Sequence, residues 1–184
     1  MSTQELLLAW RDEGQEAAFE ALFERYHASI YRVLYRMVGD EAEDLVQETF
    51  LRLYQRPPWQ EDTDVGAWLY RVATRLGYNA LRDRRRWQKY RNRLAEDTDG
   101  VGWQGGSMNP EAALERREAQ RTVQAALRTL SQRQASLLVL RYSGLRYREI
   151  ATVIGVSPNS VGTLLARAER AFGEAYRRVM AGET

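Results

Sequence analysis

The chain has 184 residues, a formal net charge of +2 and 44% hydrophobic residues. This length and composition allow one large domain or two small ones with real cores, and they exclude global disorder. The absence of cysteine excludes disulfides, thiolate metal ligands and cysteine nucleophiles. The first residues contain no basic leader, so we expect no signal peptide, and no stretch reaches the roughly 20 apolar residues of a membrane span.

Apolar residues recur at three- and four-residue steps over residues 19–37, which predicts an amphipathic helix that ends at Gly39. Asp40 and Glu43 then have side chains suited to the N-cap and N3 positions of a capping box, which predicts the start of a second helix. We expect Pro57-Pro58 to stop this second helix. Its apolar residues fall on one stripe: Ala42, Leu45, Val46, Thr49, Phe50 and Leu53.

A third helix is predicted to start near Asp64. It is expected to bury seven apolar residues: Val65, Trp68, Leu69, Val72, Ala73, Leu76 and Leu81. Strand-like alternation is not sustained anywhere in the chain, so the predicted fold class is all-α.

Residues 96–109 show no helical or strand periodicity of apolar residues. They contain four glycines and three acidic residues, which is typical of a flexible linker. Asn109-Pro110 then predicts the start of a new helix, because proline is favoured at the first helical position. The chain is therefore expected to form two small helical domains, over residues 1–95 and 113–184, with residues 96–112 as the linker.

The second domain carries the spacing of a helix-turn-helix. Ser131 and Gln134 form a capping-box pattern, and the helix that they open is expected to end at Ser143-Gly144. A short helix with Ile150, Ala151 and Ile154 on one face follows, Gly155 permits the turn, and Val156 can fill the corner. Ser157 and Pro158 open the last helix, which packs back through Val161, Leu165 and Ala168.

In such a motif the second helix presents its N-terminal side chains to DNA bases and its amides to phosphate. Asparagine and arginine suit bidentate base contacts, and serine and threonine suit phosphates. The alternative is a helical hairpin that serves packing or dimerisation. The candidate DNA-binding residues are Ser157, Asn159, Ser160, Thr163, Arg167 and Arg170.

A second candidate nucleic-acid surface follows the third helix into a basic run, RDRRRWQKYRNR. Cationic groups neutralise phosphate, and aromatic rings stack on unpaired bases. For Trp68, burial in the core is an equally good interpretation. The residues proposed for this surface are Trp68, Arg71, Arg75, Asn79, Arg82, Arg85 and Arg86.

Five acidic residues and no basic one lie between Asp40 and Glu48. Paired carboxylates such as Asp44 and Glu48 allow a metal-dependent nuclease as an alternative. Against it, His27 is the only histidine and no second acidic cluster completes a site. An acidic helix face that is either solvated or paired with a basic partner is favoured.

Together these segments resemble an extracytoplasmic-function sigma factor, the two-domain initiation subunit of bacterial RNA polymerase. DEAEDLVQETFLRLY resembles the helix that docks on the β′ clamp helices of core polymerase, which implies polymerase-binding roles for Asp44, Gln47, Glu48 and Phe50. AWLYRVATRLGYNALRDRRR is similar to the segment that melts and captures the −10 element, and the helix-turn-helix resembles the −35-reading domain.

Two departures from the family pattern concern base identity. The recognition helix reads Gly162-Thr163-Leu164-Leu165-Ala166-Arg167, with fewer basic residues than is usual. Arg75 and Asn79 stand where the family often carries asparagine and aspartate. The sequence therefore does not predict which bases are recognised in the −35 and −10 elements.

The resemblance implies a cytoplasmic transcription initiation factor that is not an enzyme, needs no cofactor and takes no small-molecule substrate. Its implied partners are core RNA polymerase, promoter DNA and an anti-sigma factor. The alternative is a stand-alone helix-turn-helix regulator with an N-terminal sensing or dimerisation domain.

Overall fold

A computed structural model describes residues 1–58, 63–94 and 110–182, and side chains at 84–94, 110–113 and 116 lie outside the description. The described residues form helices and turns with no strand, which confirms the all-α prediction. Among them, no helix has both the length and the apolar character needed to cross a membrane.

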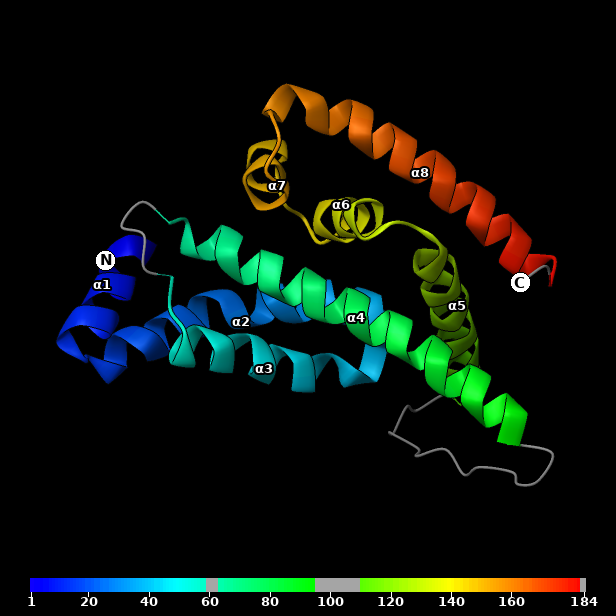
Figure 1. The fold of residues 1–184 in the computed structure, drawn as a ribbon, viewed down its shortest axis with the longest axis horizontal. Helices are drawn as coiled ribbons and strands as arrows, with labels where there is room; N and C mark the ends of the chain where they lie inside the picture. The colour runs from blue at the N-terminus through cyan, green and yellow to red at the C-terminus, as the bar shows by residue number, and fades with distance from the viewer. Residues whose placement is uncertain (59–62, 95–109, 183–184) are drawn as a thin grey trace.

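The first unit contains four α-helices and one short 3₁₀ turn (Figure 1). These are α1 (Thr3–Glu13), α2 (Glu16–Val38), η1 (Gly39–Glu41), α3 (Ala42–Gln55) and α4 (Val65–Leu94). The second unit contains α5 (Pro110–Thr129), α6 (Gln132–Tyr142), α7 (Tyr147–Ile154) and α8 (Pro158–Met180). Because α5 begins at Pro110, the helix start predicted there is confirmed, while the predicted linker sequence 96–109 lies outside the described residues.

The junction between α2 and α3 differs from the prediction. Gly39 ends α2 as expected, with φ of 70°, and its N–H donates to the Tyr35 carbonyl. However, the 3₁₀ turn η1 carries the chain straight into α3, so Glu41 and not Asp40 occupies the N-cap position, and it makes no side-chain cap within the described residues. The predicted Asp40–Glu43 capping box is therefore wrong.

The sequence analysis did not predict α1. The Ser2 hydroxyl accepts from the Glu5 N–H at 3.2 Å, and the Glu5 carboxylate accepts from the Ser2 N–H at 3.0 Å. This capping box opens the helix. Leu7 and Trp10 are buried and anchor α1 on the first unit.

The core of the first unit forms where α2 packs against α3 and α4. The apolar stripe of α3 is buried as predicted, except for the half-buried Leu45. On α4, Trp68 and Val72 are half-buried, while the other five predicted residues are buried. Gly77 lets α2 and α4 approach closely, because a Cβ there would lie 2.8 Å from the Met37 sulfur and 3.2 Å from Leu34 Cδ2.

The second unit follows the predicted helix-turn-helix. The Ser131–Gln134 capping box opens α6, and Ser143 caps its end. Gly155 adopts a left-handed conformation (φ 73°) between α7 and α8. Val161, Leu165 and Ala168 are buried and hold α8 against the rest of the unit, as expected.

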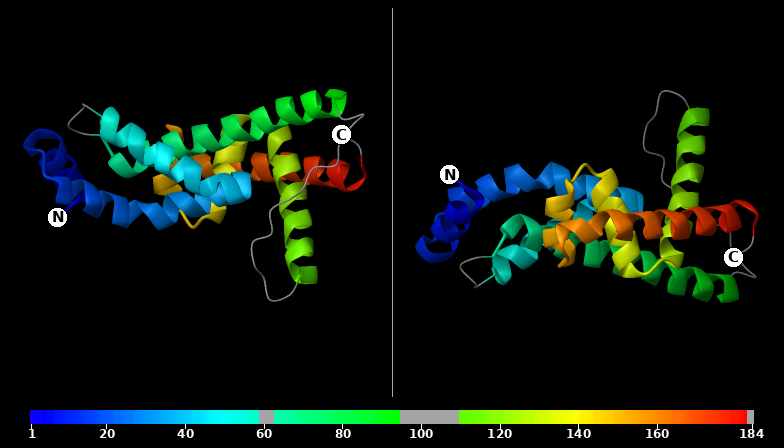
Figure 2. Two further views of the ribbon diagram at one scale, coloured as in Figure 1. Left: turned by 90° about the horizontal axis from the view of Figure 1, so that it is seen from below. Right: turned by 90° about the horizontal axis from the view of Figure 1, so that it is seen from above.

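The two units pack directly against each other, and α4 lies between α2 and α3 on one side and α6 and α7 on the other (Figures 1 and 2). We call the contacts of α2 and α4 with α5, α6 and α7 the interdomain seam. Across it, the Tyr78 hydroxyl donates to the Leu130 carbonyl at 2.9 Å, and Gln120 Nε2 donates to the Tyr35 carbonyl at 3.3 Å. The sequence analysis did not predict how the two units pack against each other.

The close approach of α2 and α4 gives a test of the packing. Gly77→Ala is expected to lower the free energy of unfolding by about 1–3 kcal/mol, because the added methyl group overlaps Met37 and Leu34. The matched control is Gly173→Ala in α8, where a Cβ meets no described atom within 4 Å. This change is expected to raise stability by about 0.5–1 kcal/mol through helix propensity. Urea denaturation measures both, and equal effects would contradict the packing.

Candidate nucleic-acid and protein interfaces

The acidic surface lies on the side of α3 that faces away from the core. Asp44 and Gln47 are exposed, and Glu48 is half-buried. The Glu48 carboxylate accepts from Arg52 Nε at 2.7 Å, one turn further along the helix. Such exposed pairs contribute little to stability. A basic partner group can therefore replace Arg52 at small cost.

Phe50 does not lie on this acidic surface. Its side chain is 3% exposed and its ring lies 4.7 Å from the ring of Phe23 on α2. The residue belongs to the core of the first unit, and it also lines a surface groove.

That groove, of about 500 Å³, runs between α2 and α3 beside the acidic surface. The sequence analysis missed it. Leu51 and Tyr54 are 47% and 55% exposed although they are large and apolar. Both lie outside the buried stripe of α3. Their positions in the sequence could therefore have indicated an exposed apolar surface on this helix. The lining residues are Phe19, Phe23, Asp44, Gln47, Glu48, Phe50, Leu51 and Tyr54.

The metal-site alternative rested on clustered carboxylates. In the parts of the chain that the structure describes, no group of three or more histidine, cysteine, aspartate or glutamate residues is placed to hold a metal ion. Glu43 instead lies 3.3 Å from Nε2 of His27.

The arginine surface lies along α4. Asp64 caps this helix by accepting from the Ala67 N–H at 2.9 Å. Four of the predicted residues are exposed and follow one another at steps of four, four and three positions, which places them on one face over roughly 17 Å. They are Arg71, Arg75, Asn79 and Arg82. Trp68 is half-buried against the core, and the side chains of Arg85 and Arg86 lie outside the description.

The third surface is the N-terminus of α8. All six residues predicted there are exposed: Ser157, Asn159, Ser160, Thr163, Arg167 and Arg170. The first amides of a helix have no intrahelical partner and carry its positive dipole end, so they favour an anion such as phosphate.

Ser157 occupies the N-cap position as expected, but its hydroxyl makes no capping hydrogen bond with any described residue. The hydroxyl therefore does not make the expected cap, and it is available for a ligand outside the protein.

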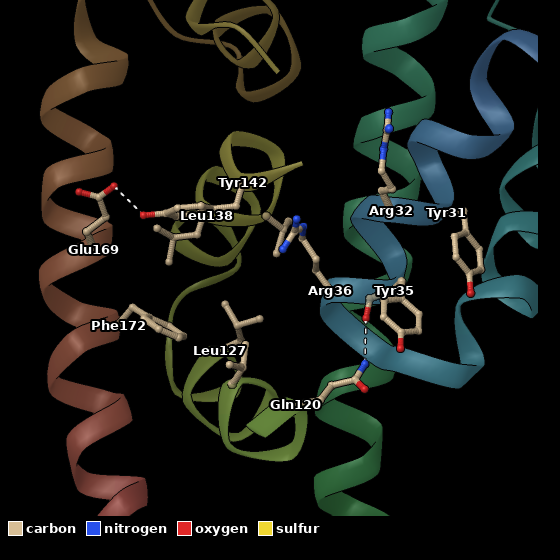
Figure 3. Close-up of a pocket in the computed structure, with 12 residues that line it drawn as sticks. Tyr31, Arg32, Tyr35, Arg36, Gln120, Leu127, Leu138, Tyr142, Glu169 and Phe172 are labelled. Atoms are coloured by element: carbon tan, nitrogen blue, oxygen red, sulfur yellow. Dashed lines mark hydrogen bonds between the residues drawn. The ribbon is translucent and has the colours of Figure 1, made fainter. Parts of the chain in front are cut away.

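A larger cavity, of about 820 Å³, opens at the interdomain seam between α2 on one side and α5, α6 and α8 on the other (Figure 3). The rings of Tyr31 and Tyr35 stack at 5.7 Å on the α2 side. Leu127, Leu138 and Phe172 face them from the second unit. No sequence pattern indicated this cavity, because residues distant in the chain form it.

Comparison with known proteins places these surfaces in named regions. Residues 22–87 match the family model "Sigma-70 region 2", and residues 120–172 match "Sigma-70, region 4". The first match contains the acidic surface of α3 and the four exposed residues of α4. The second contains the helix-turn-helix.

Curated proteins are similar over most of the chain. The RNA polymerase sigma-H factor of Pseudomonas aeruginosa is 30% identical over 91% of this chain and 90% of its own length. The ECF RNA polymerase sigma factor SigL of Mycobacterium tuberculosis is 33% identical over 86% of this chain and 89% of its own. SigW of Bacillus subtilis, also an ECF sigma factor, is 28% identical over 90% and 92%.

Two solved structures share the fold. CnrH in complex with the cytosolic domain of CnrY gives a TM-score of 0.59 at 20% identity and covers both chains completely. The sigma factor RpoE of Bartonella quintana, in complex with the anti-sigma factor NepR, gives 0.53 at 20% identity over 86% of this chain and 96% of that one.

The position of Phe50 predicts a structural effect when it is replaced. Phe50→Ala is expected to lower the free energy of unfolding by about 3–5 kcal/mol, because it empties a buried aromatic site. Gln47→Ala, one turn away and exposed, is expected to change it by less than about 0.5 kcal/mol. Urea denaturation monitored by circular dichroism compares them. A small effect of Phe50→Ala would show that the ring is not part of the core.

Proposed function

The chain belongs to the extracytoplasmic-function sigma factors of the sigma-70 family, and from this membership we propose how its surfaces divide the work of initiation. It is a transcription initiation factor that binds core RNA polymerase and directs it to promoters. The proposal concerns which residues make each contact.

The acidic surface of α3 docks on core polymerase, at the β′ clamp helices. Asp44, Gln47 and Glu48 supply the polar contacts, since their side chains line one open groove. Phe50 contributes by shaping the floor of that groove rather than by lying on the surface. Apolar contact beside paired charges is the usual composition of a protein interface.

The arginine surface of α4 holds the −10 region. Arg71, Arg75, Asn79 and Arg82 present three cations and one amide to a strand along one helix face. Trp68 supports this surface from its half-buried position, where its side chain stays partly accessible for stacking. Arg85 and Arg86 extend the same basic run in the sequence.

The N-terminus of α8 reads the −35 region in the major groove. Asn159, Thr163 and Arg167 stand at successive turns of one exposed face, so they enter a groove together. Arg170 continues this face. Ser157 and Ser160 lie at the helix end, where hydroxyls and amides meet phosphate.

The remaining assignments follow from this division. Residues 1–95 form the polymerase-docking and −10 domain, 96–112 the linker and 113–184 the −35 domain. We assign the protein to the cytoplasm, with no catalytic chemistry of its own. An anti-sigma factor is its proposed regulatory partner, as the complex of RpoE with the anti-sigma factor NepR suggests by analogy.

One observation carries this proposal. The three surfaces are exposed at the same time, and each lies within the family region that its role requires. A protein that acts by DNA binding alone gives the exposed acidic groove of α3 no role.

Polymerase docking through α3 predicts a charge-dependent complex. Asp44→Arg with Glu48→Arg is expected to abolish co-elution with core polymerase and core-dependent gel shift of promoter DNA, while leaving the circular dichroism spectrum unchanged. The control is Glu115→Arg with Glu118→Arg, which makes the same change in net charge on exposed residues of α5. Equal core binding by both double variants would remove the docking assignment. Tight specific binding of promoter DNA by the unmodified protein without core would instead favour a stand-alone regulator.

The α8 assignment predicts a sequence-dependent loss. Arg167→Ala is expected to lower run-off transcription from a promoter with its native −35 element by roughly 5–100-fold, the cost of about one bidentate base contact. It is expected to have much less effect when that element is scrambled. Arg178→Ala, exposed eleven positions further along α8, is the matched control and is expected to have no effect. The same loss on both promoters would show that Arg167 contacts phosphate and not bases.

A further inference from the structure

The cavity at the interdomain seam has the size and the lining of a small-molecule site. Its volume of about 820 Å³ lies within the range of roughly 300–1,000 Å³ that is usual for such sites, which also occur preferentially between domains. Tyr31 and Tyr35 of α2 form one wall, and Leu127 and Phe172 face them from the second unit (Figure 3). A drug-sized molecule with an apolar body therefore fits this cavity.

The wall on α2 is an aromatic platform. Tyr31 and Tyr35 are one turn apart, and their ring centroids lie 5.7 Å apart with the ring planes inclined by 24°. Tyr35 is 41% exposed, and Tyr142, which lines the cavity from α6, is 60% exposed, although both rings are large. An aromatic ring that packs against another ring, away from water, gains free energy beyond that of the buried area alone. This lining favours a ligand that contains an aromatic ring.

A pair of arginines runs along α2 beside this platform. Arg32 and Arg36 are also one turn apart, both are exposed, and both line the cavity. Figure 3 shows Arg36 extending from α2 towards Leu138 and Tyr142 on α6. In the described parts of the chain, no carboxylate forms an ion pair with either guanidinium group. Because guanidinium groups bind carboxylates and related oxyanions through paired hydrogen bonds, both are available for an anionic group of a ligand.

The charges around the cavity favour a ligand with one negative charge. Among the described residues that line it, the two arginines are accompanied by one carboxylate, that of Glu169, which accepts from the Tyr142 hydroxyl at 3.3 Å. Two cations and one anion leave an excess of one positive charge. The groove between α2 and α3 has the opposite sign, because Asp44 and Glu48 line it. An anion is therefore attracted to the seam cavity and repelled from the groove.

The protein itself bridges one end of the cavity. Gln120 Nε2 of α5 donates to the Tyr35 carbonyl of α2 at 3.3 Å, and both residues line the cavity (Figure 3). Gly39 allows this approach, because a Cβ at that position would lie 2.6 Å from Gln120 Nε2. An α-helix with its side chains is about 10–12 Å across and cannot pass through this bridge. The geometry therefore favours a compact molecule over a helical segment of a partner protein.

We propose that the seam cavity binds a small aromatic anion. The aromatic body packs on Tyr31 and Tyr35, and its carboxylate or sulfonate group accepts hydrogen bonds from Arg32 and Arg36. Both units of the chain contribute to the site. Among the described residues, none of those assigned to polymerase or DNA contact lines this cavity, so the inference goes beyond the proposed function and does not rest on it.

A matched pair of fluorescent probes tests the site in the unmodified protein. 1-Anilinonaphthalene-8-sulfonate carries both the aromatic body and the anionic group, and N-phenyl-1-naphthylamine is the same ring system without the sulfonate. The sulfonate probe is expected to saturate the protein with at least about tenfold higher affinity than the neutral probe, which is the ratio that one charge-assisted hydrogen bond supplies. Fluorescence titration measures both dissociation constants.

Substitutions then locate the bound probe. Arg32→Gln with Arg36→Gln is expected to weaken binding of the sulfonate probe at least about tenfold and to leave binding of the neutral probe unchanged. The matched control is Arg177→Gln with Arg178→Gln, which removes the same charge from exposed positions of α8 that do not line the cavity, and it is expected to change neither affinity. Tyr35→Ala is expected to weaken both probes roughly two- to tenfold, because a stacking partner is lost. Circular dichroism compares the fold of all variants with that of the unmodified protein.

The titrations also define what would overturn the inference. Equal affinity for the two probes, or binding of the sulfonate probe that survives the loss of Arg32 and Arg36, would show that the arginines do not select an anion. Binding of both probes that is unaffected by Tyr35→Ala would place the bound molecule outside the cavity. Failure of the sulfonate probe to saturate the protein would favour a protein segment as the occupant. Each of these results overturns the inference and leaves the proposed function intact, because co-elution with core polymerase and run-off transcription test that function separately.

Discussion

The rest of the structure depends on α4, because different faces of this helix make different contacts. α4 packs against α2 and α3 on one side and contacts α5, α6 and α7 on another. Between these two contact surfaces, a strip of polar residues at three- and four-residue spacing reaches solvent. Tyr78 and Arg75 are three positions apart, yet the first is 9% exposed and bonded to the second unit while the second is exposed. A single helix thus contributes to the core, to the seam and to the proposed nucleic-acid surface.

Most helix boundaries could be predicted from the sequence, because local chemistry determines them. The Ser131–Gln134 box, the Pro57-Pro58 stop and the glycine turn at Gly155 all act within a few residues. α1 escaped prediction because its short apolar burst has no clear period, although its own capping box was present. For Phe50, the buried stripe and the family resemblance gave conflicting roles. The resemblance placed it at an interface, and only packing against Phe23 assigns its ring to the core.

The seam and its cavity could not be predicted, for a different reason. Gln120, Tyr35 and Gly39 carry no recognisable pattern, and their contacts join units whose relative position no local signal determines. The exposed residues of α4 and α8 were predictable because solvent-facing positions follow directly from helix periodicity. Their distance from each other was not, since it depends on how the two units pack together. Sequence periodicity thus reports what each surface contains and says little about how far apart two surfaces lie.

The hydrogen bond between Tyr78 and Leu130 has a thermal consequence. Separation of the two units would let water replace each partner of this bond, so its net contribution to the free energy of docking is only about 0.5–1.5 kcal/mol. The larger contribution comes from the desolvation of apolar side chains such as Leu127 and Leu138, whose driving force near room temperature is entropic and weakens on cooling. Docking of the two units is therefore expected to carry a negative heat-capacity change and to weaken in the cold.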